Sequence, residues 1–219
     1  MGKHGLTTAA EDFLKAALEL ERAEGKATTN GLAARLGVTA PTVSQMAKKL
    51  DEQALVRRAP YRGVTLTERG RLVALEVLRH HRLLERYLVE TLGVPLDEVH
   101  VEADRLEHVL SEALEERIDE ALGFPTHDPH GDPIPDRELR LAEPTGRSLA
   151  SLVAGEHSTV TRVPDGDAAL LRYLAMLELV PGADVEVVLH APFGGPVTIR
   201  AGGADHAIAR ELAGAIGVA

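Results

Sequence analysis

The chain of 219 residues contains no cysteine. This absence excludes disulfides, thiolate zinc sites, iron–sulfur clusters and cysteine nucleophiles. Any bound metal ion must therefore have oxygen and nitrogen ligands. Tryptophan is also absent, and Phe and Tyr number only three each, which disfavours an aromatic platform for stacking bases or sugars. Aliphatic side chains must form the core.

Long apolar runs are missing as well. No stretch approaches the roughly 20 apolar residues that a membrane-spanning helix requires. Near the N-terminus, Glu11, Asp12 and Lys15 interrupt any apolar run of the length that a signal peptide needs. We therefore expect a cytoplasmic protein with no membrane partner.

The formal net charge of -10 is distributed unevenly along the chain. Residues 1–72 contain 12 basic and 8 acidic residues, a net charge of +4, whereas the remainder carries -14. A basic segment followed by an acidic one indicates two tasks on one chain. The first segment suits an anionic polymer, and the second can hold cations.

Apolar spacing and stop signals predict three helices before residue 54, over residues 8–22, 30–36 and 40–53. The last two are separated by a short turn that contains Gly37, as in a helix-turn-helix. Residues 54–58 and 63–67 are typical of two strands of a hairpin. We expect a winged helix-turn-helix domain over residues 1–72.

The third predicted helix begins with short polar side chains, as a helix that reads the DNA major groove requires. Cations on this helix and on the hairpin suit phosphate contacts. Gln45 can pair with adenine, and Thr42 can contact a thymine methyl group. The candidate DNA-binding residues are Thr39, Pro41, Thr42, Ser44, Gln45, Lys48, Lys49, Arg57, Arg58 and Arg62.

The rest of the sequence predicts a second helical domain over residues 73–143 and a small β domain over residues 144–219. Long helices are expected from about 67 to 92 and from 100 to 122, before a proline-rich linker. Strands are then expected over 158–163, 184–189 and 197–201, with a short helix over 167–177. The fold class is mainly α with a small barrel-like β domain.

Acidic and histidine side chains recur at helical spacing in the predicted second domain. His100, Asp104 and His108 follow one another at intervals of four, so Asp104, Glu107 and His108 can converge on one ion. His81 and Glu85 form a similar pair on the preceding helix. Asp12 of the first helix can add a carboxylate, which would connect metal binding with the DNA-binding half.

Other titratable residues near these positions are given ordinary roles. Lys15 is interpreted as a solvated cation. His80 points about 100° away from His81 around the helix and is interpreted as a surface residue. The histidines without clear partner spacing are His127, His130, His157, His190 and His206.

Taken together, several segments resemble the diphtheria toxin repressor family of metal-activated transcriptional regulators. The resemblance covers nearly the whole chain, including the second domain's metal-ligand segments and its closing loop. In the C-terminal part it extends to an SH3-like domain shared with ferrous-iron transport accessory proteins. The matching segments are residues 41–45, 61–63, 66–67, 81–86, 107–111, 129–135 and 177–182.

The resemblance implies a primary, activating metal site formed by Asp12, Asp104, Glu107 and His108. It also implies an ancillary site from His81, Glu85 and His100, with Asp167 near the place of a ligand from the SH3-like domain. Leu170 stands where an amide ligand is expected. Lys15 replaces a glutamate of short manganese-type members, which argues against a close two-metal centre.

The resemblance to this family also favours Mn(II) as the cofactor, with Fe(II), Co(II) or Zn(II) as alternatives. Iron-type members have Met and Cys where this chain has Asp12 and Asp104, and carboxylates prefer harder ions. We therefore expect a manganese-activated regulator, a repressor of manganese uptake genes. It would bind a double-stranded DNA operator as a homodimer. The two copies would contact each other through the helices that carry Leu106, Val109, Leu110, Leu114 and Ile118.

Three alternatives remain open from the sequence. An iron(II) or zinc sensor could have the same architecture. A metal-dependent hydrolase could use the same ligands to activate water, but no nucleophile motif or phosphate-binding glycine loop is visible, so we expect no enzyme. A metal buffer or SH3-like adaptor would lack sequence-specific DNA binding.

Overall fold

The computed structural model describes residues 5–59, 63–143 and 145–219. The chain forms two compact units, each assembled from segments that are separate in the sequence. Unit 1 consists of the chain up to Leu84, Asp104–Ala121 and Ile134–Leu141. Unit 2 consists of Glu85–Ala103, Leu122–Pro133 and Ala142–Ala219.

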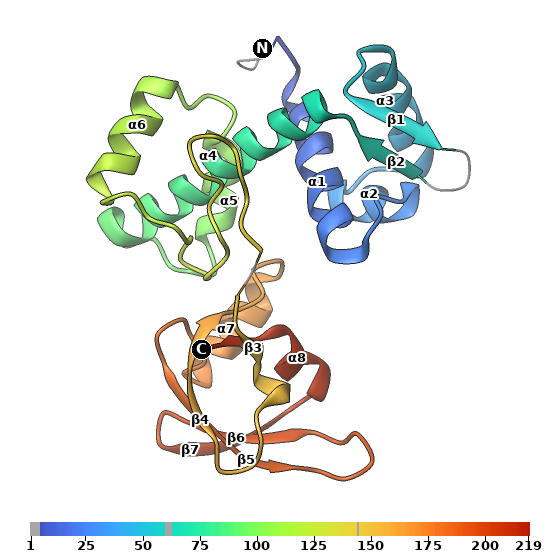
Figure 1. Cartoon of the computed structure of the whole chain (residues 1–219). Helices are drawn as coiled ribbons and strands as arrows, with labels where there is room; N and C mark the ends of the chain where they lie inside the picture. The colour runs from blue at the N-terminus through green and yellow to red at the C-terminus, as the bar shows by residue number, and fades with distance from the viewer. Residues whose placement is uncertain (1–4, 60–62, 144) are drawn as a thin grey trace. The chain divides into compact units, whose positions relative to one another are not determined.

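Unit 1 begins with the predicted helix-turn-helix and hairpin (Figure 1). Side-chain oxygens of Thr7, Thr28 and Thr39 each accept a backbone N–H in the first turn of the helix that follows, which satisfies an N–H group that has no partner within the helix. The elements are α1 (Thr8–Glu24), α2 (Thr29–Leu36), α3 (Ala40–Glu52), β1 (Val56–Ala59) and β2 (Gly63–Leu66).

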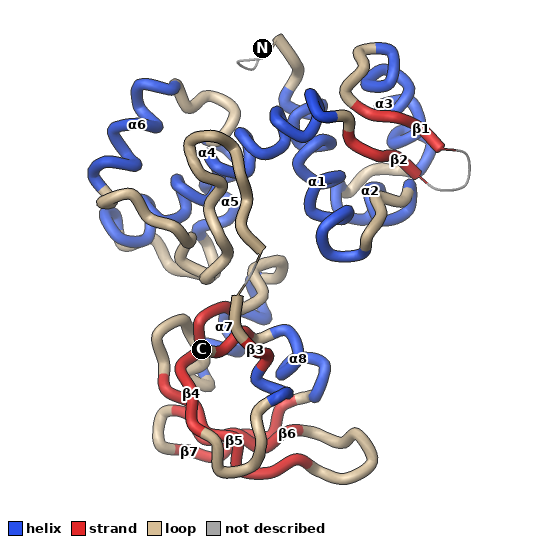
Figure 2. The backbone as a smooth tube through the Cα atoms, viewed as in Figure 1, coloured by secondary structure: helices blue, strands red, loops and turns tan. Residues whose placement is uncertain are grey.

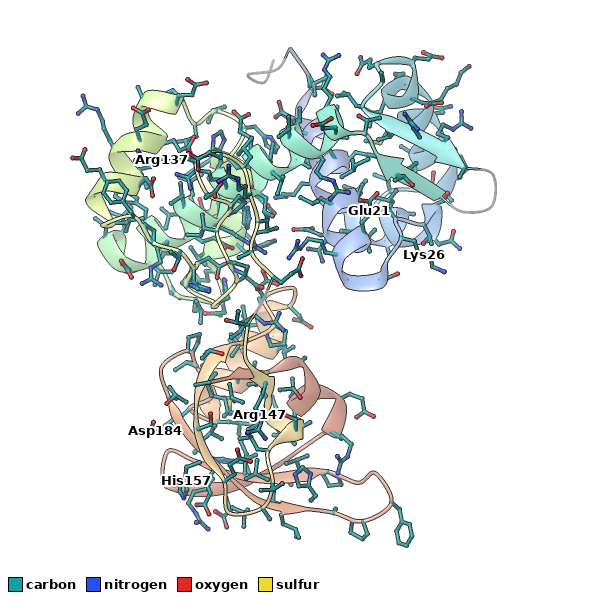
Figure 3. All side chains as sticks on the ribbon, viewed as in Figure 1. Glu21, Lys26, Arg137, Arg147, His157 and Asp184 are labelled. Carbon is teal, nitrogen blue, oxygen red and sulfur yellow. The ribbon has the colours of Figure 1, made fainter. Side chains whose placement is uncertain are left out.

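The wing is held to α1 by a buried core and by one carboxylate. Phe13, Leu14 and Leu18 of α1 are almost fully buried in this core. Glu21 of α1 accepts the N–H of Leu66 at 2.9 Å and contacts Arg71 at 2.7 Å; Figure 3 labels it. Val43, Ala47 and Leu50 of α3 belong to the same core, so α3 and the wing both rest on α1.

Gly70 lies against the backbone that leads into the wing. A Cβ atom at this position would lie 1.9 Å from the carbonyl oxygen of Leu55. We expect Gly70→Ala to lower the free energy of unfolding by about 1–3 kcal/mol, because the backbone must shift. Gly214→Ala, also in a helix but with nothing within 4 Å, is the control. Urea denaturation measures both, and equal stabilities would contradict the expectation.

The prediction of one long helix over residues 100–122 is wrong. The structure has α4 (Glu68–Leu92), then α5 (Val99–Leu106) and α6 (Glu112–Ala121). Ser111 begins a new helix, because its side chain accepts the N–H of Leu114 at 3.3 Å. Glu107 and His108 consequently lie in the connection between α5 and α6, where helical spacing does not apply.

Unit 2 contains a six-stranded antiparallel sheet in the order β3-β8-β4-β5-β6-β7, drawn in red in Figure 2. One face is covered by aliphatic side chains such as Val187, Val197 and Ile199, which are fully buried. The strands are β3 (Arg147–Ser148), β4 (His157–Arg162), β5 (Asp184–His190), β6 (Val197–Ala201), β7 (Ala204–Ile208) and β8 (Gly217–Val218).

Three of these strands and the helix α7 (Ala168–Met176) lie where the sequence predicts them. β3, β7, β8, the 3-10 helix Leu149–Ser151 and the short helix α8 (Arg210–Ala215) were not predicted. β3 and β8 are only two residues long, too short for an alternation pattern. Closure of the sheet into a barrel remains a prediction. Within the described part of the chain, none of the helices is both long and apolar enough to span a membrane.

Candidate metal centres and DNA interface

The polar start of α3 is exposed and internally organised. Thr39 caps the helix, and its hydroxyl lies 2.9 Å from that of Thr42. Pro41 occupies the first turn, where a missing N–H has no cost. Ser44 donates to the carbonyl of Ala40 at 3.0 Å. The start of α3 therefore presents short hydrogen-bonding side chains at the surface.

The other candidate DNA-binding residues lie on the same two elements. Gln45, Lys48 and Lys49 are exposed on α3, and Arg57 and Arg58 are exposed on β1. These solvent-accessible cations suit phosphate contacts. Arg62 lies outside the described residues.

Three of the predicted metal ligands converge in unit 1. Asp12 of α1, Glu107 and His108 each offer a ligand atom, and these atoms lie within 4.8 Å of one another. His108 Nε2 is 2.8 Å from Asp12 Oδ1 and 3.2 Å from Glu107 Oε1. The Glu107 side chain is completely buried, whereas that of Asp12 is 39% exposed. We call this cluster the α1 centre.

Glu11 belongs to the surroundings of the α1 centre and was missed from the sequence. It is buried, and its Oε2 lies 2.8 Å from His108 Nδ1. Burial lowers the pKa of His108, but hydrogen bonds to Asp12 and Glu11 outweigh this effect and raise the pKa above its usual value. A metal-binding histidine usually has a carboxylate on its second ring nitrogen. The adjacent acids Glu11 and Asp12 were the sequence signal from which Glu11 could have been predicted.

The interpretation of Lys15 as a solvated cation is wrong. Its side chain is only 11% exposed, and its Nζ lies 2.7 and 2.8 Å from the two oxygens of Glu107. Nζ also lies 3.0 Å from Asp104 Oδ1. Burial lowers the pKa of Lys15, but the negative charges of Glu107 and Asp104 outweigh it and raise the pKa above its ordinary value. Sequence spacing could not find these contacts, because the partners are 89 and 92 residues away.

Asp104 and His81 meet Lys15 rather than Asp12 in this arrangement. His81 Nδ1 is 2.6 Å from Glu107 Oε2, 3.3 Å from Asp104 Oδ1 and 3.4 Å from Lys15 Nζ. The resemblance assigned Asp104 to the primary site and His81 to the ancillary site, whereas within unit 1 the two lie together.

His80 is not a surface residue, contrary to the sequence interpretation. It is 4% exposed, with Nδ1 3.0 Å from the carbonyl oxygen of Glu107 and Nε2 2.9 Å from Glu115 Oε2. His80 thus fills the space between α4, the connection at Glu107 and α6. The predicted angle between His80 and His81 around α4 was right, but the connection at Glu107 and helix α6 cover the side of α4 that carries His80.

Unit 2 brings together two residues of the predicted ancillary site. His100 Nδ1 lies 3.1 Å from Glu85 Oε1. The Glu85 side chain is fully buried, and Glu85, Asp128 and His130 each offer a ligand atom within 4.8 Å of the others. We call Glu85, Asp128 and His130 the loop centre.

His130 of the loop centre was passed over because it has no partner at helical spacing. Its position comes from a tight turn, in which Asp128 Oδ1 accepts the N–H groups of His130 and Asp132, both at 2.9 Å. Gly131 permits this turn, with φ +93° and no room for a Cβ beside the carbonyl oxygen of Thr161. The acid–Pro–His–Gly–acid pattern of residues 128–132 was the sequence signal from which this turn could have been predicted.

The imidazole of His130 is oriented by the backbone. Nε2 lies 3.2 Å from the carbonyl oxygen of Leu96, which leaves Nδ1 facing Glu85 Oε2 at 3.8 Å. Nδ1 has no hydrogen-bond partner in the described ranges. Burial lowers the pKa of His130, but the interaction with the Glu85 carboxylate, followed by the charges of Asp128 and Asp165, outweighs it and raises the pKa to about 9.

Asp167, the predicted ligand from the C-terminal domain, caps α7. Its Oδ1 accepts the N–H groups of Ala169 at 2.7 Å and Leu170 at 3.4 Å. A metal ion would therefore have to bind the other oxygen. Its role as a ligand remains a prediction.

The chemistry of the donor sets fits a divalent cation. Each centre offers two carboxylates and one imidazole without sulfur, a set suited to hard or borderline ions. In each centre the histidine's other nitrogen already has a partner, Glu11 or the Leu96 carbonyl, which fixes the ring for binding.

Three sequence profiles match the chain along most of its length. Residues 5–64 match the iron-dependent repressor N-terminal DNA-binding domain. Residues 67–136 match the iron-dependent repressor metal-binding and dimerisation domain. Residues 147–219 match the FeoA domain.

Several characterised relatives and solved structures are similar. The iron-dependent repressor IdeR of Mycobacterium tuberculosis is 36% identical over 225 residues, which cover 97% of each chain. The diphtheria toxin repressor of Corynebacterium diphtheriae is 37% identical over 130 residues, covering 59% of this chain and 58% of the relative. A structure described as a manganese-dependent transcriptional repressor in complex with manganese is 40% identical, with a TM-score of 0.85, and covers 95% of this chain and 98% of that one.

The winged helix, the acid–histidine centres and the C-terminal antiparallel sheet together define a metal-dependent DNA-binding regulator of transcription. The chain belongs to the diphtheria toxin repressor family, whose members are metal-dependent transcriptional repressors that bind DNA and dimerise.

Proposed function

We propose that this protein is a manganese-activated repressor of metal uptake genes, which binds its operator as a homodimer. The observation that carries the proposal is the convergence of Asp12, from the helix beneath the wing, with Glu107 and His108, which follow α5. A cation held there would join the DNA-binding part to the metal-binding part of unit 1.

Asp12, Glu107 and His108 are the proposed ligands of the α1 centre, Asp104 stays the fourth ligand that the resemblance implies, and Glu11 holds the His108 ring in place. A divalent cation would supply positive charge that these ligands share. Asp12 would then be held to Glu107 and His108, and α1 with it. Since α3 and the wing rest on α1, their position becomes linked to metal binding. Metal must bind the DNA-competent state more tightly for this linkage to act.

We further propose that the loop centre, with Glu85, Asp128 and His130, is the second metal position. His100 contacts Glu85 and Asp167 belongs to the same unit, so both remain candidates to complete it. This arrangement would supplement the ancillary set of His81, Glu85, His100 and Asp167 that the sequence predicts.

The proposed DNA contacts are those of the exposed start of α3 and the wing. Gln45 and Thr42 would contact base edges. The cations Lys48, Lys49, Arg57 and Arg58, with Arg62, would contact phosphates. Domain boundaries at residues 72 and 143 and closure of the C-terminal sheet into an SH3-like barrel are part of the same proposal.

The proposed dimer would use the exposed apolar side chains around α5 and α6. Leu106, Val109 and Leu114 are 40%, 77% and 49% exposed. Leu110 and Ile118, also predicted for the interface, are buried in the chain itself and support that surface from within.

Manganese is preferred because the proposed ligands are carboxylate and imidazole only. A related structure is described as manganese-dependent, but the relative IdeR is described as iron-dependent. Iron(II) is therefore the second candidate, since an oxygen and nitrogen site by itself binds later transition metals more strongly than manganese.

Fluorescence anisotropy of a labelled candidate promoter, with Mn(II), Fe(II), Zn(II) and Co(II) titrated anaerobically at fixed salt, tests this function. We expect Mn(II) to induce binding at the lowest concentration. His108→Ala should abolish the metal-dependent increase. His157→Ala, at an exposed histidine of unit 2, is the matched control. Binding at a lower Fe(II) concentration would favour the iron sensor, and binding that ignores metal would refute the proposal.

A further inference from the structure

His80 is a buried residue of α4 whose two ring nitrogens both have partners. It is 4% exposed. Nδ1 lies 3.0 Å from the carbonyl oxygen of Glu107, and Nε2 lies 2.9 Å from Glu115 Oε2. A carbonyl oxygen can only accept a hydrogen bond, so the Nδ1–H group donates to it. Neither nitrogen is left for a metal ion, and the function proposed above gives His80 no part.

The carbonyl group that His80 contacts belongs to the peptide unit between two proposed metal ligands, Glu107 and His108. A peptide unit is planar, so it turns as one body. Its orientation sets the direction in which the His108 side chain leaves the backbone, relative to Glu107. The ligand atoms His108 Nε2 and Glu107 Oε1 lie 3.2 Å apart. A rotation of this peptide unit would move one of them away from the other.

Helical hydrogen bonds do not hold this peptide unit in place. Helix α5 ends at Leu106. In the described part of the chain, the His80 ring reaches the Glu107 carbonyl oxygen and no backbone N–H group does. A buried carbonyl group without a partner is costly. His80 therefore supplies the hydrogen bond that a continuing helix would have supplied.

The other side of the His80 ring is anchored to α6. Glu115 is a residue of α6, and its Oε1 lies 2.6 Å from Nε of the buried Arg79 side chain. Arg79 thus holds the Glu115 carboxylate, and the carboxylate holds the His80 ring. The ring cannot turn without losing its contacts to both Glu115 and the Glu107 carbonyl.

We propose that His80 is a positioning residue of the α1 centre. Its Nδ1–H group fixes the peptide unit between Glu107 and His108, so that the two ligands face the same cation. The affinity of the α1 centre for Mn(II) therefore depends on a side chain that binds no metal itself. This inference rests on the proposed function of the α1 centre.

The test is the Mn(II) affinity of two full-length variants, measured by equilibrium dialysis. His80→Asn keeps an N–H group at the place of Nδ1, within reach of the Glu107 carbonyl, and His80→Gln keeps one at the place of Nε2, within reach of Glu115. We expect His80→Gln to lower the affinity of the α1 centre by about 10–100-fold, the usual loss when a group that supports a metal ligand is removed. His80→Asn should retain most of the affinity.

Each variant loses one of the two contacts of His80, so urea denaturation without Mn(II) should show a loss of stability in both. A role in packing alone would lower the metal affinity in both variants or in neither. Equal affinities of the folded variants, or a higher affinity in His80→Gln, would therefore overturn the inference. His157→Gln, at an exposed histidine of unit 2, should bind Mn(II) as the unsubstituted protein does. If circular dichroism shows that His80→Gln does not fold, His80→Met replaces it, with the same loss expected.

Asp12→Ala separates this inference from the function on which it depends. If the α1 centre is a metal site, Asp12→Ala should bind one Mn(II) ion fewer than the unsubstituted protein. Retention of every ion would refute the α1 centre itself. Loss of that ion, together with equal affinities in His80→Asn and His80→Gln, would refute only the role of His80. In the Asp12→Ala background, His80→Gln should leave the remaining Mn(II) binding unchanged, because the ring contacts Glu107 and Glu115.

Discussion

Glu107→Gln is expected to abolish manganese-dependent DNA binding and to lower the free energy of unfolding by about 3 kcal/mol, even without metal. The Glu107 carboxylate is the common partner of Lys15, His81 and His108, and it is fully buried. The neutral amide keeps the shape of the side chain but removes the charge. The Lys15 ammonium would then remain buried with Asp104 as its only carboxylate partner among these groups.

The metal affinity of the same variant should fall by more than about 100-fold, which is the upper range for the loss of a residue that only supports a ligand. Mn(II) dialysis and urea denaturation without metal measure the two effects separately. Glu120→Gln, an exposed acid on α6, removes the same charge and should change neither quantity. An unchanged stability would show that Glu107 does not compensate Lys15, and an unchanged affinity would exclude it as a ligand.

Arg79→Met is expected to lower the free energy of unfolding by about 3–5 kcal/mol, because it removes one partner of a buried ionic network. The Arg79 side chain is 6% exposed. Its Nε lies 2.6 Å from Glu115, one terminal nitrogen lies 2.8 Å from Asp119, and the other donates to the carbonyl of Pro135 at 2.7 Å. It holds α4, α6 and the segment after Pro133 together.

Thermal unfolding followed by circular dichroism measures this loss, which should lower Tm by about 10 °C in a chain of this size. Arg137→Met is the matched control, since Arg137 also contacts Asp119, at 3.2 Å, but is 56% exposed; Figure 3 labels it. An exposed pair contributes less than about 1 kcal/mol. Equal effects of the two substitutions would contradict the assignment of the stability to the buried network.

The loss of stability at low pH provides a second test of the role of Arg79. Burial raises the pKa of Glu115, but hydrogen bonds from His80 and Arg79 outweigh it and lower the pKa from 4.5 to about 2. The folded pKa is below the unfolded value, so this stability is present above pH 4.5 and is lost as the pH falls toward 2. Arg79→Met removes part of the cause. Its acid unfolding should therefore begin at higher pH than that of the unsubstituted protein, whereas Arg137→Met should unfold as the unsubstituted protein does.

Local sequence signals were sufficient for the DNA-binding part. Thr7 and Thr39 mark helix starts by their side-chain oxygens, and Gly25 and Gly37 adopt the left-handed conformation that ends a helix. Residues close in sequence produce these features, so no knowledge of packing was needed. The same holds for the exposed polar start of α3.

The metal ligands could be predicted only in part. The types of the ligands and the segments that contain them were evident, and Asp12, Glu107 and His108 do converge, as do Glu85 and His100. The grouping was assigned by helical spacing and resemblance; within unit 1, Asp104 and His81 both lie beside Glu107 and Lys15. Whether each residue binds a metal remains a proposal.

By itself, the sequence determined the helix caps, the wing, the separation of basic and acidic parts and the absence of sulfur ligands, because each depends on residue type or on neighbours along the chain. Only the tertiary structure decided that Lys15, Glu11, His80 and His130 lie beside the candidate ligands. Lys15 is 89 and 92 residues from Asp104 and Glu107, and Glu11 is 97 residues from His108. Contacts over such separations arise from the packing of helices and loops, and a charged side chain is buried there only because that packing supplies its opposite charge.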